Sequence, residues 1–238
     1  MERLSDNTQT ISCGEIRENY LRICGEVREA MAAANRTDKV RIMAVTKTVA
    51  AEKVNFAVGL GLDLLGENRV QEFLDKREAY APAEVHFIGG LQTNKVKYII
   101  DKVSMIHSVD SLRLAEEIDR RAAQNGRIMD ILTEINIGEE ETKGGVSADS
   151  AEEFCAGIAE LKNVRLRGLM TIPPPGCSES CFARMQELFE CLKRRFDKEN
   201  APFDTLSMGM SGDFAAAIKF GATIVRIGSG LFGYRKYS

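Results

Sequence analysis

Short apolar runs alternate along this chain with longer stretches in which apolar residues recur every three or four positions. The short runs are rich in branched residues and too short for stable helices, which is typical of buried strands. They predict eight strands, at residues 41–46, 63–65, 85–89, 103–107, 128–137, 164–169, 203–208 and 223–227. The longer stretches predict helices at residues 51–60, 69–80, 93–101, 111–124, 149–161, 179–198 and 212–220, and an additional helix at 15–34 before the first strand.

Residues that favour helix ends agree with these boundaries. Ser111, Asp149 and Ser211 precede helical stretches, and we expect them to be N-caps because their side chains accept hydrogen bonds from free backbone N–H groups. Gly126 and Gly221 follow helical stretches, where glycine commonly ends a helix. Each predicted helix is therefore separated from the strands on either side.

The regular alternation of strands and helices predicts an α/β protein with a parallel sheet. Eight such units favour a closed barrel over an open doubly wound sheet. No linker divides the chain, and the proline-rich segment at 173–176 follows the sixth strand as a loop. We therefore predict a single domain over residues 1–238: a (β/α)8 TIM barrel with an extra N-terminal helix.

Composition and charge exclude several kinds of partner. Of the 238 residues, 44% are hydrophobic and 28% are charged, which is ordinary for a globular domain. The net charge of -3 gives no basic surface for nucleic acid. No apolar segment approaches the roughly 20 residues that span a bilayer, and the N-terminus lacks the apolar core of a signal peptide. We expect a cytoplasmic protein, and a monomer because no long exposed apolar stripe is evident.

Six cysteines are spread along the chain without any Cys-x-x-Cys pair. Cys177 and Cys181 are four residues apart, but the sequence contains only two histidines, His86 and His107, and neither is nearby. This spacing does not match the ligand sets of structural zinc sites. We expect reduced, partly buried thiols rather than disulfides or a metal site.

Two glycine- and serine-containing segments follow the seventh and eighth predicted strands. They are Ser207–Asp213 and Gly228–Gly230. TIM barrels commonly bind phosphate in the loops after these two strands. Glycine lets the backbone approach a phosphate, serine donates a hydroxyl, and a helix that starts near Ser211 would add its positive end. The alternative is ordinary turn chemistry with Ser211 as a cap, but the matching strand positions favour a phosphate site.

Lys47 lies at the end of the first predicted strand, on the same face of the barrel as the two segments. A lysine that leaves an apolar strand is commonly just solvated. A partly desolvated lysine, in contrast, has a lowered pKa and an amine that can attack a carbonyl. An amine and a phosphate site on one face suggest a cofactor with an aldehyde and a phosphate, and pyridoxal 5′-phosphate (PLP) is the obvious candidate.

Further polar residues lie in or near the predicted strands. Arg226 is inside the eighth strand, where a buried arginine needs a partner such as the Glu134 carboxylate or a cofactor ring nitrogen. Asn68, His86 and Asn136 lie at or near the ends of other strands. Each of these three could instead serve a structural hydrogen bond, and His86 could be a satisfied core residue.

Several of these segments resemble, in consistent order, the signatures of the YggS/PROSC family of PLP homeostasis proteins. The matching segments are Ala44–Thr48, Gly66–Glu72, His86–Lys95, Arg167–Pro173, Leu206–Ser211 and Val225–Gly233. The resemblance covers residues 16–235. It implies a fold like the N-terminal barrel of alanine racemase, with PLP held as an internal aldimine on Lys47.

The same resemblance implies roles for other residues. Phosphate contacts would come from the loop at 207–211 and from Gly228 and Ser229, and Arg226 would face the pyridine nitrogen. An arginine there keeps the nitrogen unprotonated, which makes the ring a poorer electron sink. The residues expected to hold the cofactor are Lys47, Asn68, His86, Asn136, Ser207, Gly209, Met210, Ser211, Arg226, Gly228 and Ser229.

Three functions are compatible with these residues. The first is that of a non-enzymatic PLP carrier in intracellular PLP homeostasis, with apo PLP-dependent enzymes as candidate recipients. The second is a PLP-dependent racemase, which needs two bases on opposite faces of the substrate. In alanine racemase the second base is a tyrosine of a separate domain, and this sequence ends after the predicted barrel. Its tyrosines, of which only Tyr234 is near a strand end, are Tyr20, Tyr80, Tyr98, Tyr234 and Tyr237. The third, a cofactor-free aldolase, is disfavoured because that class places its lysine on a later strand. We therefore expect storage, buffering or delivery of PLP without robust catalysis.

Overall fold

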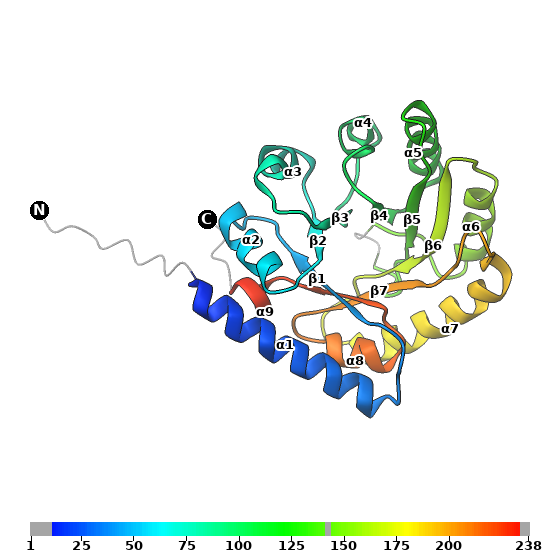
Figure 1. Cartoon of the computed structure of the whole chain (residues 1–238). Helices are drawn as coiled ribbons and strands as arrows, with labels where there is room; N and C mark the ends of the chain where they lie inside the picture. The colour runs from blue at the N-terminus through cyan, green and yellow to red at the C-terminus, as the bar shows by residue number, and fades with distance from the viewer. Residues whose placement is uncertain (1–10, 141–143, 234–238) are drawn as a thin grey trace, which may run out of the picture.

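The computed structural model describes residues 11–140 and 144–233. Eight parallel strands follow one another around a closed barrel in chain order, and β8 pairs with β1 to close it (Figure 1). The strands are β1 Arg41–Val45, β2 Leu64–Glu67, β3 Glu84–Phe87, β4 Met105–Val109, β5 Met129–Glu134, β6 Val164–Met170, β7 Thr205–Met210 and β8 Ile224–Ile227. Each overlaps a predicted strand, so the prediction of a (β/α)8 barrel is confirmed.

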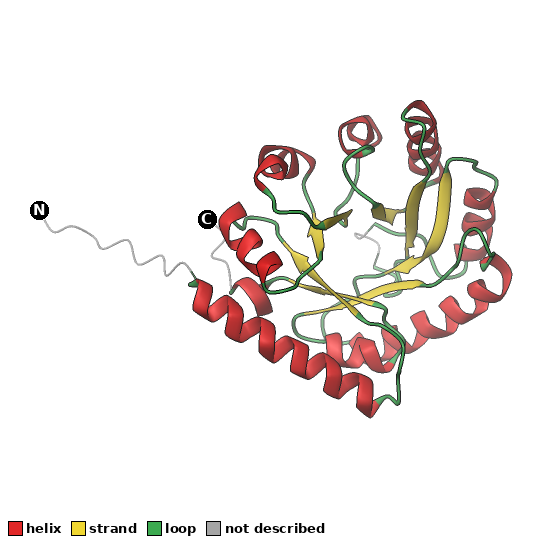
Figure 2. Ribbon diagram, in the orientation of Figure 1, coloured by secondary structure: helices red, strands yellow, loops and turns green. Residues whose placement is uncertain are grey.

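Helices cover the outside of the barrel (Figure 2). They are α1 Cys13–Ala33, α2 Ala51–Gly59, α3 Val70–Lys76, η1 Arg77–Ala79, η2 Thr93–Lys95, α4 Val96–Ile99, α5 Leu112–Gln124, α6 Ala151–Ala159, α7 Ser178–Phe196, α8 Phe214–Lys219 and α9 Ser229–Phe232. The extra N-terminal helix is α1, which lies outside the barrel against α8 and α9 (Figure 1). The short helix α9 was not predicted. None of the helices in the described ranges is long and apolar enough to cross a membrane.

The predicted helix ends are partly confirmed. The hydroxyl of Ser111 accepts a hydrogen bond from the backbone at the start of α5. Gly126 and Gly221 follow α5 and α8 with φ of +61° and +92°, which glycine adopts without steric cost. The prediction for Asp149 is wrong, because α6 begins after Ser150, whose side chain makes no capping hydrogen bond.

Two apolar layers hold the barrel together. Alternate residues along each strand face opposite sides, so that Ala44 and Leu65 join the core under the helices. Their neighbours Met43, Val45 and Leu64 pack inside the barrel. Because all eight strands are parallel, their carboxyl ends meet at one end of the barrel, where side chains from distant segments come together.

Candidate functional site

A pocket with a volume of 460 Å³ lies at the carboxyl ends of the strands, and we call it the strand-end pocket. Its walls come from β1, β8 and the loops that follow β2, β3, β6, β7 and β8. Several residues expected from the sequence line it: Lys47, Asn68, Met210, Ser211, Arg226, Gly228 and Ser229. The closed topology of the barrel thus joins the ends of six strands, β1, β2, β3, β6, β7 and β8, in one cavity.

Lys47 extends from the end of β1 into this pocket and is half-buried. In the described parts of the chain, no hydrogen bond or ion pair engages its amine. The next residue, Thr48, has φ of +60°, a left-handed conformation that is rare for a β-branched residue. Its N–H donates to the Glu72 carboxylate, which holds this turn in place. The strained turn places a free amine against the cavity, and strain of this kind is common at functional sites.

A second lysine beside this turn, Lys76, differs from Lys47 because hydrogen bonds within the protein hold its amine. Lys76 donates to the carbonyl oxygen of Thr46 at 2.9 Å and to the carboxylate of Glu72 at 2.8 Å. Below them, the buried Glu67 carboxylate accepts hydrogen bonds from the hydroxyls of Thr46 at 2.6 Å and Tyr80 at 2.5 Å. Burial, followed by the hydrogen bond to Glu67, raises the pKa of Tyr80, so this tyrosine stays protonated. The amine of Lys76 is therefore engaged within the protein, whereas that of Lys47 is available to a ligand.

Asn68 follows β2 and lies next to the loop after β3. A Cβ on Gly89 would lie 2.2 Å from the Asn68 carbonyl oxygen, so only glycine permits this close approach. The side-chain oxygen Oδ1 of Asn68 is buried and has no hydrogen-bond partner among residues 11–140 and 144–233. A buried acceptor without a donor is costly, so this atom is suited to receive a hydrogen bond from a ligand.

The loops after β7 and β8 are tied to each other. The Ser211 hydroxyl accepts a hydrogen bond of 3.0 Å from the Gly230 N–H. The expectation that Ser211 caps a helix is wrong, because α8 begins at Phe214 and its N-cap residue is Asp213. Gly209 has φ of +89°, and a Cβ there would lie 2.5 Å from the Cβ of a residue on α8. The two glycine-containing loops therefore form one wall, although Gly209 serves the packing of α8 and does not line the pocket.

The unpredicted helix α9 starts in this wall. Gly228 precedes it, and the Gly228 carbonyl accepts hydrogen bonds from the N–H groups of Leu231 and Phe232. The Gly-Ser-Gly sequence at 228–230 is typical of a turn, and only the apolar pair that follows it indicates that the turn continues as one helical turn.

Arg226 is 4% exposed and faces the strand-end pocket from β8. Its Nη1 donates to both the carbonyl and the hydroxyl oxygen of Ser207 at 2.8 Å, and its Nη2 donates to the Thr171 carbonyl at 2.7 Å. Burial lowers the pKa of Arg226 to about 10, so the guanidinium is still a cation at neutral pH. Within the described ranges, Arg226 forms no ion pair with Glu134, which had been an expected partner. Oxygen atoms of the barrel wall hold it instead.

Three more expected residues do not reach the pocket. Ser207 is fully buried inside the barrel, beneath Arg226. The Asn136 side chain donates to the Glu140 carbonyl at 2.9 Å and accepts from the Glu140 N–H at 3.1 Å, so it folds its own loop. His86 lines a separate opening at the amino ends of the strands. Direct contact of these residues with a ligand in the strand-end pocket is therefore not supported by the geometry.

The rim of the pocket contains two apolar side chains, of which Met210 was expected from the sequence and Ile172 was not. Ile172 is 42% exposed and Met210 37% exposed, both beside the cavity. Ile172 precedes the proline-rich segment after β6, and its sequence position gave no functional signal. Of the tyrosines, Tyr20, Tyr80 and Tyr98 do not line the pocket, whereas Tyr234 and Tyr237 are outside the described residues.

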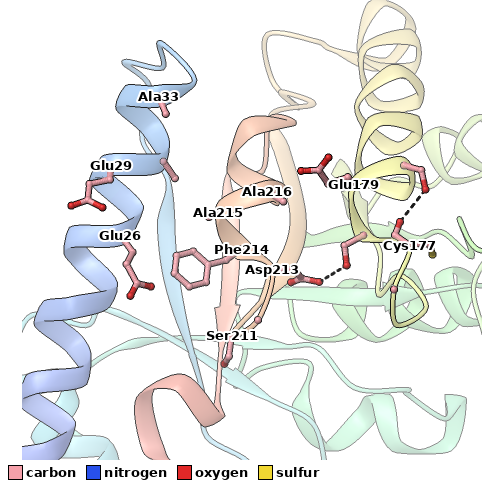
Figure 3. Close-up of a pocket in the computed structure, with 15 residues that line it drawn as sticks. Glu26, Glu29, Ala33, Cys177, Glu179, Ser211, Asp213, Phe214, Ala215 and Ala216 are labelled. Atoms are coloured by element: carbon pink, nitrogen blue, oxygen red, sulfur yellow. Dashed lines mark hydrogen bonds between the residues drawn. The ribbon is translucent and has the colours of Figure 1, made fainter.

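A larger groove of 960 Å³ lies on the other side of the Ser211–Asp213 loop (Figure 3). It runs between α1 and the start of α7, across α8. Glu26, Glu29 and Glu179 line it together with Asp213, whose carboxylate accepts a hydrogen bond from the Ser178 hydroxyl at 2.9 Å. This negative lining repels an anionic ligand. The smaller strand-end pocket, with its two cationic side chains, is the one suited to a phosphate.

The cysteines do not form a metal centre within the described parts of the chain. The Sγ atoms of Cys177 and Cys181 are 3.1 Å apart, and all six cysteines are free thiols. Burial, followed by the hydrogen bond with Cys177, raises the pKa of the Cys181 thiol to about 11. This thiol is therefore protonated and a weak ligand at neutral pH.

Fold and site together define a class of protein: a (β/α)8 barrel with a free lysine amine at the end of its first strand and glycine- and serine-containing loops after its last two. A family model described as alanine racemase, N-terminal domain, matches residues 13–236. The chain therefore belongs to the alanine racemase N-terminal domain family.

Similar proteins cover most of the chain. A pyridoxal phosphate homeostasis protein of Aquifex aeolicus is 45% identical over 227 residues, which cover 92% of this chain and 98% of the relative. PipY of Synechococcus elongatus, solved with PLP bound, has a TM-score of 0.74 and 30% identity and covers 87% of this chain and 100% of its own. An alanine racemase of Clostridium difficile has a TM-score of 0.73 at 15% identity, covering 94% of this chain and 58% of its own, and shows likeness of fold.

Proposed function

We propose that this protein binds PLP in the strand-end pocket and serves PLP homeostasis in the cell by storing, buffering or delivering the cofactor. The observation that carries this proposal is the free Lys47 amine in the same cavity as the loops after β7 and β8. The printed names of the relatives support it, since the Aquifex aeolicus protein is a pyridoxal phosphate homeostasis protein and PipY has been solved with PLP bound.

The residues of the pocket fit this cofactor. PLP supplies an aldehyde that bonds covalently to a lysine amine and a phosphate that needs hydrogen-bond donors. Lys47 supplies an amine that no group in the described residues engages. Ser211, Gly228 and Ser229 line the same pocket from the loops after β7 and β8, where backbone and hydroxyl groups are suited to hold a phosphate. The orphaned Oδ1 of Asn68 offers an acceptor beside Lys47.

Arg226 is the group that we assign to the pyridine nitrogen. The guanidinium can only donate hydrogen bonds, and it is a cation at neutral pH. A donor that keeps its own proton leaves the ring nitrogen unprotonated, which weakens the ring as an electron sink. We therefore propose binding of PLP without robust turnover.

The apolar rim is consistent with a carrier. Ile172 and Met210 leave side-chain surface exposed at the mouth of the cavity. None of the tyrosines in the described residues lines the pocket as a second base for racemisation. Apo forms of PLP-dependent enzymes are the recipients that we propose for the released cofactor.

The visible absorption spectrum of the purified protein with PLP tests the proposed binding. We expect a visible band that Lys47→Ala abolishes, and borohydride reduction should fix the cofactor on the peptide that contains Lys47. Lys39→Ala is a matched control, since Lys39 is exposed at the opposite end of the barrel. A protein that stays colourless with PLP, or a band that survives Lys47→Ala, would refute the proposal.

A second assay separates a carrier from an enzyme. The protein loaded with PLP is incubated in deuterated water with a panel of amino acids, and exchange at the α-carbon is measured. We expect no exchange above that of free PLP. Exchange that is fast and depends on Lys47 would show an enzyme instead.

A further inference from the structure

A continuous line of hydrogen bonds runs through the interior of the barrel, from the exposed Glu84 to buried Arg226. At the amino-end opening, the Glu84 carboxylate lies 2.7 Å from His86 Nε2. His86 Nδ1 lies 2.9 Å from His107 Nε2, and His107 Nδ1 lies 3.1 Å from the Ser207 hydroxyl. The Ser207 hydroxyl then accepts from Arg226 Nη1 at 2.8 Å, and Arg226 lines the strand-end pocket. The line thus joins two cavities at opposite ends of the barrel.

The two ends of this line fix its direction. Arg226 can only donate a hydrogen bond, and an ionised carboxylate such as Glu84 can only accept one. The Ser207 hydroxyl therefore accepts from Arg226 and donates to His107 Nδ1. His107 then carries its proton on Nε2 and donates to His86, and His86 carries its proton on Nε2 and donates to Glu84.

The reverse assignment leaves groups unsatisfied. A proton on His107 Nδ1 would point at the Ser207 oxygen and leave the hydroxyl proton without an acceptor. If both histidines were reversed, an unprotonated His86 nitrogen would face the Glu84 carboxylate. Unsatisfied buried groups of this kind cost stability, so only one pattern satisfies every member.

The surroundings favour neutral histidines. His86 is 1% exposed and His107 is fully buried. Burial lowers the pKa of both, and the Arg226 charge adds to this effect at His107. Two other charged groups that act on His86 are Arg41, which pairs with Glu84 at 2.7 Å, and Asp130, which pairs with Arg165 and Arg167. Asp38, Lys39 and Asp204 also line the amino-end opening. Hydrogen bonds from His86, followed by Arg41, lower the pKa of Glu84 to about 2, so this acceptor stays ionised.

We propose that Glu84, His86, His107 and Ser207 are positioning residues, which hold the Arg226 guanidinium toward the strand-end pocket through a one-way chain of hydrogen bonds. This series of hydrogen bonds gives a role to the polar side chains that cross the barrel interior. Its effect on a bound cofactor rests on the proposed function, whereas the chain itself is a property of the protein without a ligand.

Proton–nitrogen NMR spectra of the two imidazoles, recorded on the full-length protein without PLP, test this chain of hydrogen bonds directly. Only two histidines are present in the sequence, so the single variant His86→Gln assigns both signals. We expect both rings to be neutral and protonated on Nε2 from about pH 5 to 8. An imidazolium, or a proton on Nδ1 of either ring, would overturn the proposal.

Variants at the far end test whether the chain transmits an effect. Glu84→Gln keeps a hydrogen-bond acceptor for His86. Glu84→Met has a side chain of similar size but no such acceptor. We expect the His107 signal of Glu84→Gln to match that of the unsubstituted protein, and Glu84→Met to show a mixture of both tautomers. An unchanged His107 signal in Glu84→Met would show that the direction is not set by Glu84.

The cofactor is the third readout. We expect His107→Phe to raise the dissociation constant of PLP about tenfold, equivalent to about 1.4 kcal/mol, and to shift the visible band. Met105→Leu, a buried change on the same strand, is the matched control for packing. Equal dissociation constants and bands in the two variants would overturn the positioning role. If the unsubstituted protein binds no PLP, the proposed function fails, and the NMR spectra still decide whether the chain exists.

Discussion

Glu134, at the carboxyl end of β5, makes the stability of the fold depend on pH. Burial, followed by the nearby charge of Asp110, raises the pKa of this carboxyl from 4.5 to about 7, and Arg226 opposes the shift. A carboxyl whose pKa is higher in the folded state binds its proton more tightly there. The folded state is therefore favoured at low pH, and this advantage is lost as the pH rises from 4.5 through 7.

The change in the free energy of unfolding follows from the raised pKa of Glu134. Raising the pKa of Glu134 from 4.5 to about 7 is equivalent to about 3 kcal/mol in the free energy of unfolding. Glu134 is partly exposed, and solvent screening reduces this value, so we expect about 2 kcal/mol. Glu134→Gln, which stays neutral at every pH, should be more stable than the unsubstituted protein by that amount at about pH 8. The two proteins should differ little at about pH 4.

Urea unfolding of both proteins, followed by circular dichroism between about pH 4 and 8, measures this difference. Asp110→Asn is an informative control, because it removes the second contribution and should reduce the pH dependence without abolishing it. Parallel stability curves for Glu134→Gln and the unsubstituted protein would refute the reasoning, since they would show that Glu134 has the same pKa in both states.

Three further predictions concern two positions at the site and one cysteine of α7. Gly89→Ala should lower the free energy of unfolding by about 2 kcal/mol or more, because its Cβ would lie 2.2 Å from the Asn68 carbonyl oxygen, whereas Gly90→Ala, where the space is open, should be near neutral in the same urea titration. Ser211→Ala should weaken PLP binding about tenfold in a fluorescence titration, with a smaller loss of stability, because it breaks one hydrogen bond between the two loops. Cys181 should react with iodoacetamide more slowly than the exposed thiols at about pH 8, since its pKa is about 11, and equal rates by mass spectrometry would contradict this.

The architecture was predictable because the hydrophobic period reports burial directly. Each short apolar run is buried on both faces, as parallel strands in a barrel are, and each longer stretch has one apolar face. The errors lie at helix ends. Ser211 has the side chain of an N-cap, but its hydroxyl is used to join the loops after β7 and β8. The helix begins after Asp213 instead, and tertiary contacts decide between the two.

The residues of the pocket could be predicted from the sequence where they lie at predicted strand ends. Lys47, Asn68, Arg226 and the loop after β8 reach the cavity because the carboxyl ends of parallel strands meet at one end of the barrel. Ile172 could not be found, since an apolar residue beside a proline-rich loop gives no chemical signal. Gly209 was assigned to a ligand although it serves helix packing, because the sequence shows the need for glycine but not what approaches it.

His86 shows why interior positions of a barrel are harder to assign than strand ends. A polar residue in an apolar run can face the helices, the barrel interior near the carboxyl ends of the strands, or the interior near their amino ends. The order of residues in the sequence does not distinguish these three positions. His86 and His107 are 21 residues apart, and the stagger of β3 against β4 brings their rings within hydrogen-bond distance. Considered singly, each histidine has a structural explanation. When the two histidines are considered together, the hydrogen-bond partners of each ring also determine which of its nitrogens carries the proton. The hydrogen bonds continue from His107 through Ser207 to Arg226. A residue that lies outside the pocket can therefore still determine how the pocket presents its charge.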